Sequence, residues 1–207
     1  MLHSRVGMGS KPVSFLSEEE YLALDRAAEV RSEYHGGQMF AMSGGTLLHS
    51  KIAVNLASEF SNALRGKDCD VFGSDTRVLI RKPRASVYPD LSVACGKLAD
   101  ETKDILEVPA LVAEVRSPST EKFDRGAKFS KYRNIESLRE YMLVSQDAPL
   151  VELFSRQPSG AWLLTEARGL ESGIRIESLG CEIPLAGIYY RVSLPTPEPE
   201  DDGPPAL

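Results

Sequence analysis

The chain of 207 residues contains no apolar run long enough to cross a membrane. Its most apolar stretches, such as residues 110–115, are far shorter than the ~20 residues that a transmembrane helix needs. No basic segment followed by an apolar segment opens the chain, so we expect no signal peptide. These absences predict a soluble protein of the cytoplasm that has no membrane partner.

Cysteine is also scarce, since the chain has only Cys69, Cys95 and Cys181. This odd set lacks the close spacing of zinc or thiol redox motifs, so the sequence predicts reduced thiols in the core or on the surface. The motifs G-x-S-x-G and G-x-x-x-x-G-K are absent as well. Their absence argues against a serine hydrolase and against a P-loop nucleotide-binding protein.

Positive charge is in short supply overall, and the net charge is −6. Such a balance disfavours a nucleic-acid partner, which usually binds a basic surface. However, four acids lie in the closing segment PTPEPEDDGPPAL, and without these four the net charge is −2. Residues 116–139 hold seven bases against three acids. A second basic cluster consists of Arg77, Arg81, Lys82 and Arg84. Positive charge is therefore concentrated, although each cluster could equally be a solvated face.

The composition, with 42% hydrophobic and 26% charged residues, is typical of one globular domain. We predict that this single domain spans residues 12–195. Residues 1–11 are expected to be disordered or an expression remnant. Residues 196–207 are rich in proline and acids, which predicts a disordered tail.

Two helices can be placed from capping and periodicity. Ser17 and Glu20 form a capping-box pair, which predicts a helix from about residue 18 to 28 with an apolar stripe. The expected stripe consists of Leu22, Leu24 and Ala28. A second helix follows from the recurrence of an apolar residue every four positions, and it ends near Gly66. Its repeat consists of Leu48, Ile52, Leu56 and Phe60.

The remaining pattern predicts strands. Residues 33–42 favour a hairpin, and residues 70–80 favour a strand with a break near Gly73. Further strands are expected at 87–95, 110–116 and 140–145, and a hairpin is expected from 150–155 and 161–166. A helix over 121–133 joins two of these strands, which usually gives a parallel crossover. The sequence therefore predicts an α/β fold with a mixed β-sheet flanked by helices and a C-terminal hairpin extension.

Two acidic residues stand among apolar neighbours. Glu114 lies inside the strand ALVAEVRS, where an unpaired charge would be costly to bury. Arg116 must emerge on the same strand face, so an ion pair is one explanation. The other explanation is a metal, because Asp90 follows Pro89 on the preceding strand and two convergent carboxylates suit Mg²⁺. The residues alone leave both explanations open.

Several longer stretches resemble a known family, the Uma-type restriction endonucleases of the PD-(D/E)XK nuclease superfamily. The resemblance extends from about residue 18 to 190. The stretches that carry it are RSEYHGGQMFAMSGG, LHSKIAVNLASEF, SDTRVLI, YPDLSV, LVAEVRSPSTEKFDRGAKFSKYR and SLREYMLVSQDAPLVELFSR. The YPD and EVRSPST elements, followed by DRGAK, are its most specific parts.

The resemblance implies a restriction-endonuclease-like fold in which Asp90 and Glu114 bind Mg²⁺. The sequence departs from the superfamily pattern at Arg116, where a lysine is usual, and a guanidinium is a poor general base. The lysine role is therefore expected to move to Lys128, which shares a predicted helix face with Asp124 and Tyr132. Lys131 is the rival for this role.

Further site residues also follow from the resemblance. Glu33 matches an early acidic position and would bind a second metal or hold a water. His49 and Asp75 match recurrent family positions and are expected to support the metal ligands. The residues expected to contact nucleic acid are Arg77, Arg116, Lys128 and Lys131.

The resemblance implies a metal-dependent endonuclease that hydrolyses phosphodiester bonds, with DNA as the expected substrate. Its cofactor would be Mg²⁺, with Mn²⁺ as a substitute, and a homodimer would allow both strands to be cut. The alternative hypothesis is a catalytically silent module that keeps the nuclease fold for binding, because a fold does not guarantee an activity.

Overall fold

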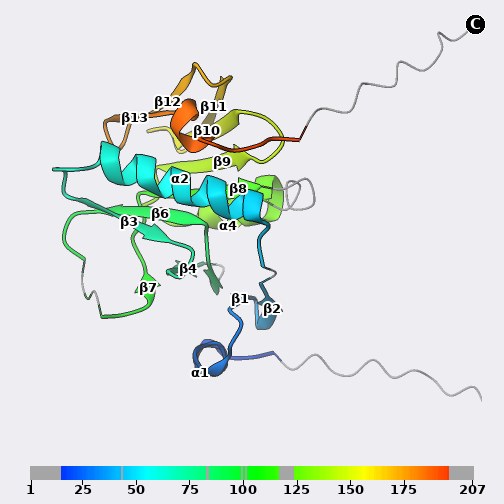
Figure 1. The fold of residues 1–207 in the computed structure, drawn as a ribbon. Coiled ribbons are helices and arrows are strands. Elements are labelled where there is room, and N and C mark those ends of the chain that lie inside the picture. Colours follow the sequence, from blue (N-terminus) through cyan, green and yellow to red (C-terminus); the bar gives the residue numbers. More distant parts are fainter. Residues whose placement is uncertain are drawn as a thin grey trace, which may run out of the picture.

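A computed structural model describes residues 15–42, 44–82, 84–98, 100, 102–116 and 124–195. The predicted segments 1–11 and 196–207 therefore lie outside the described residues. Within the described part, strands form a larger sheet, a smaller sheet and a separate hairpin, with helices packed against them (Figure 1). The prediction of an α/β fold with a mixed sheet flanked by helices is confirmed.

The larger sheet has the strand order β11-β10-β9-β8-β6-β3, which places β8 near its centre. Its strands are β3 Cys69–Gly73, β6 Leu91–Cys95, β8 Leu111–Arg116, β9 Glu140–Ser145, β10 Leu150–Arg156 and β11 Trp162–Arg168. β8 and β9 are parallel, as the strand-helix-strand passage predicts, and the other pairs are antiparallel. The predicted hairpin is formed by β10 and β11.

The smaller sheet has the order β2-β1-β5-β4-β7. Its strands are β1 Ser32–His35, β2 Gln38–Ala41, β4 Arg77–Arg81, β5 Arg84–Val87 and β7 Ile105–Leu106. The expected single strand over 87–95 is wrong, because the chain leaves the smaller sheet after β5 and enters the larger one at β6. Pro89 lies at this crossing, where its missing N–H removes a donor that a continuous strand would need.

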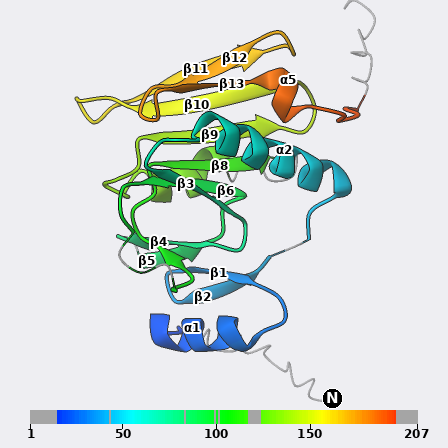
Figure 2. The ribbon, with the colours of Figure 1, turned by 60° about the vertical axis from the view of Figure 1, so that its left-hand side comes forward.

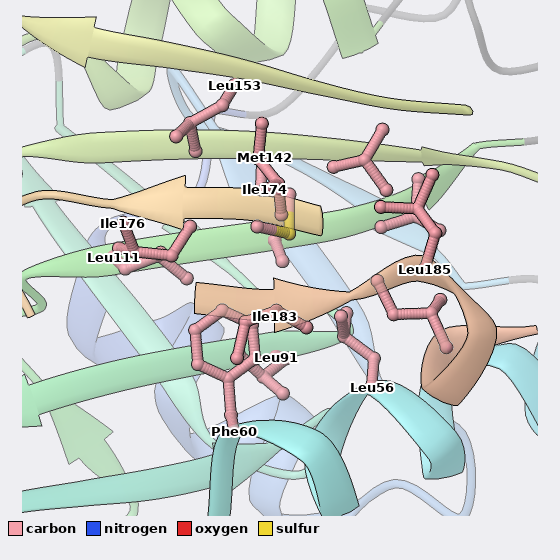
Figure 3. Close-up of a cluster of buried hydrophobic side chains, with 14 of the residues drawn as sticks. Leu56, Phe60, Leu91, Leu111, Met142, Leu153, Ile174, Ile176, Ile183 and Leu185 are labelled. Atoms are coloured by element: carbon pink, nitrogen blue, oxygen red, sulfur yellow. The ribbon is translucent and has the colours of Figure 1, made fainter. Parts of the chain in front are cut away.

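One face of the larger sheet is covered by α2 Leu47–Ala63, by the hairpin of β12 Gly173–Ile176 and β13 Cys181–Pro184, and by α5 Leu185–Ile188. The apolar repeat predicted for α2 is confirmed, since Ile52, Leu56 and Phe60 are fully buried. Side chains from the helix, the sheet and the hairpin meet in one cluster (Figure 3). The β12-β13 hairpin itself was not predicted.

The opposite face packs against the smaller sheet and a short helical segment. This segment begins with the π-helix η1, Asp124–Lys128, and continues as α4, Phe129–Tyr132. The predicted helix over 121–133 is thus found from residue 124 onward, and its first residues lie outside the described part. Val112 and Leu143 of the sheet pack here with Phe129 and Tyr132. Along β8, Glu114 and Arg116 therefore point toward the helical segment, because alternate residues face opposite sides.

Helix α1, Glu18–Ala27, lies beyond the smaller sheet (Figure 2). Its capping box is confirmed, since Ser17 and Glu20 exchange side-chain to main-chain hydrogen bonds. The expected apolar stripe is wrong: Tyr21 and Asp25 are buried, whereas half of Leu24 is exposed. The helix is anchored by polar contacts that hydrophobic periodicity does not report.

The structure corrects the prediction of three reduced thiols. Cys69 and Cys95 form a disulfide, because the antiparallel register of β3 and β6 places them directly opposite each other. Their separation of 26 positions hides this pairing in the sequence. Cys181 is a free, buried thiol, as expected. None of the described helices is long and apolar enough to span a membrane.

Candidate active site

Asp90 and Glu114 are brought together by the register of β6 and β8. Leu91 pairs with Ala113 in this antiparallel ladder. Continued by one residue, this register runs to Asp90 and Glu114, and the charges of these two residues interact. Asp90 itself lies in the bend that precedes β6, not within a strand. The two carboxylates thus meet at one end of the larger sheet.

Both oxygens of Asp90 accept hydrogen bonds. The main-chain N–H of Val115 donates to Oδ2 over 2.7 Å, and Nε2 of His49 lies 2.8 Å from Oδ1. His49 stands in the first turn of α2, where Thr46 caps the helix by accepting from the N–H of His49. Gly45 leaves room for the imidazole, since a Cβ there would lie 3.0 Å from its Nδ1. The start of α2 therefore fixes the orientation of Asp90.

Glu114 is buried and is held by the helical segment across the sheet face. Its Oε1 lies 2.7 Å from Nζ of Lys128 and accepts a hydrogen bond of 2.8 Å from the hydroxyl of Tyr132. Among the described residues, the other oxygen, Oε2, accepts no hydrogen bond. One oxygen of Glu114 is thus bound by both Lys128 and Tyr132.

Glu33 on β1 brings a third carboxylate to the site. Its Oε1 lies 3.4 Å from Nζ of Lys128 and accepts from the main-chain N–H of Tyr88. Its Oε2 lies 3.1 Å from Nε2 of His35. The ammonium of Lys128 therefore sits between the carboxylates of Glu33 and Glu114.

Ionisation of the two central carboxyls is disfavoured. Burial raises the pKa of Glu114 to about 8; Lys128 opposes this effect, whereas the charges of Asp90 and Asp124 add to it. Burial also raises the pKa of Asp90, although the Val115 N–H and the charge of His49 oppose it. A divalent cation would stabilise both ionised forms, and carboxylate oxygens are its preferred ligands. The two carboxyls are thus chemically suited to such an ion.

The buried ammonium of the site belongs to Lys128. Burial favours the neutral amine, but the carboxylates of Glu114 and Glu33 outweigh burial and raise the pKa of Lys128. Lys131, its rival in the sequence, is half-buried one turn later in α4. Burial and the charge of Lys128 lower the pKa of Lys131, while Glu33 opposes them. Lys128, and not Lys131, forms the ion pair with Glu114.

Arg116 does not pair with Glu114, which corrects one explanation drawn from the sequence. Its guanidinium Nη2 lies 3.3 Å from Oε2 of Glu152 on β10. Glu152 is almost wholly buried and is also bound by Arg125 of η1. Glu114 and Arg116 share a strand face as expected, but each is paired with a residue from a different element.

Two predicted residues lie away from these contacts. Asp75 is exposed in the turn after β3, and no ion pair or hydrogen bond joins it to the described site residues. Arg77, expected to contact nucleic acid, is fully buried, so this prediction is wrong. Its guanidinium pairs with Asp25 and Asp104 and donates to the hydroxyl of Tyr88.

Sequence reasoning missed three supporting residues. Tyr132 was placed on the helix face of Lys128 but was given no role, although it holds Glu114. His35 holds Glu33 and lies two positions after it, a strand spacing that puts both on one face. Glu152 gave a signal of the same kind as Glu114, a carboxylate inside an apolar strand. That signal was available in LVELF but was not used.

Among the described residues, no group of three or more His, Cys, Asp or Glu side chains has the arrangement of a metal site. The nearest arrangement is the pair Asp90 and Glu114, with Glu33 beyond Lys128. An ion that keeps several waters needs few protein ligands, so a pair of carboxylates is compatible with Mg²⁺.

Comparisons with known proteins agree with this fold. The model of the Uma2 family, described as "putative restriction endonuclease", matches residues 18–186. Two uncharacterised proteins of Synechocystis, slr1290 and sll1609, are 36% and 32% identical to the chain over 87% and 74% of its length, and over 94% and 88% of their own. A crystal structure from Anabaena variabilis, titled a putative nuclease belonging to DUF820, matches with a TM-score of 0.67 at 17% identity. That match covers 83% of this chain and 96% of the other, and it shows the fold alone.

Proposed function

The chain belongs to the Uma2 family of restriction-endonuclease-like proteins, and from this premise we propose that it is a metal-dependent endonuclease that hydrolyses phosphodiester bonds of DNA. The observation that carries the proposal is the contact between Lys128 and Glu114. A buried ammonium lies 2.7 Å from the Glu114 carboxylate, which also interacts electrostatically with a second carboxylate, Asp90. Such a charge arrangement is expensive to bury and is typical of a functional site.

Asp90 and Glu114 would hold a divalent cation, Mg²⁺ or Mn²⁺, through their oxygens. When bound, the ion would supply Lewis-acid chemistry: it would acidify an attacking water and offset the charge that builds on the phosphate. Glu114 can offer Oε2, since Tyr132 and Lys128 already engage Oε1. His49 and the Val115 N–H would fix the rotamer of Asp90.

Lys128 would act as a positive charge and not as a base. The carboxylates of Glu114 and Glu33 raise the pKa of Lys128, which favours the ammonium form. A protonated amine can donate to a phosphate oxygen or orient the attacking water, and it stabilises negative charge that develops in the transition state.

A second function is favoured by a specific observation. His49 bonds to Asp90 and Lys128 bonds to Glu114, so both carboxylates already have cationic or donor partners within the chain. A nuclease fold whose carboxylates are already paired by its own side chains could serve as a binding module without catalysis. This reading predicts that the site needs no metal.

Titration calorimetry with Mg²⁺ and with Mn²⁺ tests the proposal, run beside a nicking assay on supercoiled plasmid. We expect the wild type to bind the ion and to nick DNA, and Asp90→Ala to do neither. The matched control is Asp70→Asn, because Asp70 is an exposed aspartate on β3 of the same sheet. The control should behave as the wild type does.

The two functions give opposite results. A wild type that binds no divalent ion and cuts no DNA, while still binding nucleic acid, would favour the silent module. An Asp90→Ala variant that cuts as well as the wild type would remove Asp90 from the site.

A further inference from the structure

Glu152 occupies the same cross-strand row as the candidate site. Glu114 pairs with Leu143, and Leu143 pairs with Glu152, so the three residues lie side by side on β8, β9 and β10. Residues in one row point to the same sheet face. Glu152 therefore lies two strands, or roughly 10 Å, from Glu114 under the same helical segment.

The burial of Glu152 calls for an explanation, because only 1% of the residue is exposed. A buried carboxylate is costly unless cations compensate it. Two guanidiniums do so: Arg125 donates to Oε1 and also pairs with Oε2, and Arg116 lies 3.3 Å from Oε2. The carboxylate of Glu152 therefore forms ion pairs with both Arg116 and Arg125.

These two residues lie on either side of the chain segment that leads from the sheet to the lysine. Arg116 ends β8, two positions after Glu114, and Arg125 belongs to η1, three positions before Lys128. Glu152 therefore ties the strand that carries the acid to the helix that carries the lysine. π-helical turns are rare overall, but those that occur are frequently found at functional sites.

We propose that Glu152 is a positioning residue of the active site. Through Arg125 it holds η1, and through Arg116 it holds the end of β8, so that Lys128 reaches Glu114. The inference rests on the proposed nuclease function for its effect on catalysis. Its structural part, the docking of the helical segment, stands without that function and can be measured separately.

The chain contains its own reporter of this docking. Trp162, the only tryptophan, meets Phe129 of α4 edge to face, with ring centroids 5.3 Å apart. Phe129 directly follows Lys128, so a displaced helical segment would alter the surroundings of the indole. Quenching of tryptophan fluorescence by acrylamide therefore reports the docking whether or not the protein cuts DNA.

The experiment compares Glu152→Gln with Glu166→Gln. Glu166 is the cross-strand partner of Glu152 on β11, but it pairs with Arg168 at the surface. We expect Glu152→Gln to lower kcat about 10- to 100-fold with KM within about twofold, the range found when residues that orient metal ligands are changed. Quenching of Trp162 should increase. Glu152→Asp, which keeps the charge, should restore part of both, and Glu166→Gln should change neither.

Arg125→Gln provides a second variant if Glu152→Gln fails to fold, because Arg125 is one-third exposed. It should reproduce the loss of kcat and the increase in quenching, and in the double variant the two effects should not add. Folded variants with unchanged kcat and unchanged quenching would overturn the proposal, as would a Glu166→Gln variant that shows the same changes. If the wild type is inactive on every nucleic acid, the nuclease proposal fails, and quenching alone decides whether Glu152 docks the helix.

Discussion

The ammonium of Lys128 lies between the carboxylates of Glu33 and Glu114 at the end of the sheet. Its removal should reduce the rate of cleavage while the protein still folds. We expect Lys128→Ala to reduce metal-dependent cleavage by about 10²- to 10³-fold, the effect of deleting one preorganised donor to a developing charge. Metal affinity should remain, because Asp90 and Glu114 keep their oxygens. Single-turnover plasmid cleavage and calorimetry measure the two quantities.

Lys131→Ala is the matched control for this change, since Lys131 lies one turn away in the same helical segment. It should weaken DNA binding in a salt-dependent manner and leave the cleavage rate of the bound complex unchanged. If Lys131→Ala abolished cleavage and Lys128→Ala did not, the lysine role would belong to Lys131.

Asp25 and Arg77 form a buried pair that supports the site from a distance. Arg77 also binds the hydroxyl of Tyr88, which precedes Asp90 by two residues. Burial opposes the ionisation of Asp25, but Tyr88, the Ser32 N–H and Arg77 together lower its pKa below the ordinary 3.8. The carboxylate therefore stabilises the folded state above pH 3.8, and this contribution is lost as the pH falls through the lowered value.

Asp25→Asn should accordingly lower the free energy of unfolding at pH 7 by up to roughly 3–5 kcal/mol, because the buried guanidinium of Arg77 loses one of its two carboxylate partners and keeps only Asp104. The difference from the wild type should shrink as the pH falls below 3.8. Urea unfolding at a series of pH values measures it. A difference that grew toward low pH would contradict the assigned direction of the pKa.

At the scale of elements, α2 joins the core to the site, because its first turn carries His49 and its middle carries buried side chains. Phe60 is fully buried, so Phe60→Ala should cost about 3–5 kcal/mol through lost burial and the cavity left behind. Val54, on the outer side of the same helix, is 66% exposed, and Val54→Ala should stay within about 0.5 kcal/mol. Similar losses for both variants in urea unfolding would contradict the packing of α2.

The disulfide ties the edge strand β3 to β6. It closes a loop of 26 residues, for which the chain-entropy account gives about 3 kcal/mol of stabilisation. Alkylation of the denatured, unreduced protein should modify one of the three cysteines, Cys181. Three modified cysteines in the mass spectrum, or a reduced protein of unchanged stability, would show that β3 is held by its ladder alone.

Elements with a strong local signal were predictable. The capping box at Ser17, the repeat of α2 and the turn of the β10-β11 hairpin all depend on neighbours in sequence. The switch between sheets at residues 88–90 had one local signal, Pro89, which disfavours a continuous strand; the apolar residues on both sides of it nevertheless suggested a single strand. The β12-β13 hairpin does alternate between buried and exposed residues, but each of its strands has only four residues, which gives a short signal.

At the scale of the whole molecule, the site is assembled from segments far apart in the chain. Glu33, His49, Asp90, Glu114 and Lys128 come from β1, α2, the bend before β6, β8 and η1. Their identities were expected from the family resemblance, and Arg77 shows the limit of that reasoning. A cluster of basic residues in the sequence does not show which of them the fold buries. Arg77 is buried, and it stabilises α1 through Asp25 and the segment before Asp90 through Tyr88.

The cleavage of supercoiled plasmid as a function of Mg²⁺ concentration, by the wild type and by Glu114→Gln, tests the central claim most directly. Glu114→Gln keeps the shape of the side chain and removes the charge that is needed to hold the ion and to pair with Lys128. We predict saturable, Mg²⁺-dependent nicking by the wild type and none by the variant. Nicking by both proteins at equal rates, or nicking by the wild type that persists in excess chelator, would contradict a metal-dependent nuclease site at Asp90, Glu114 and Lys128.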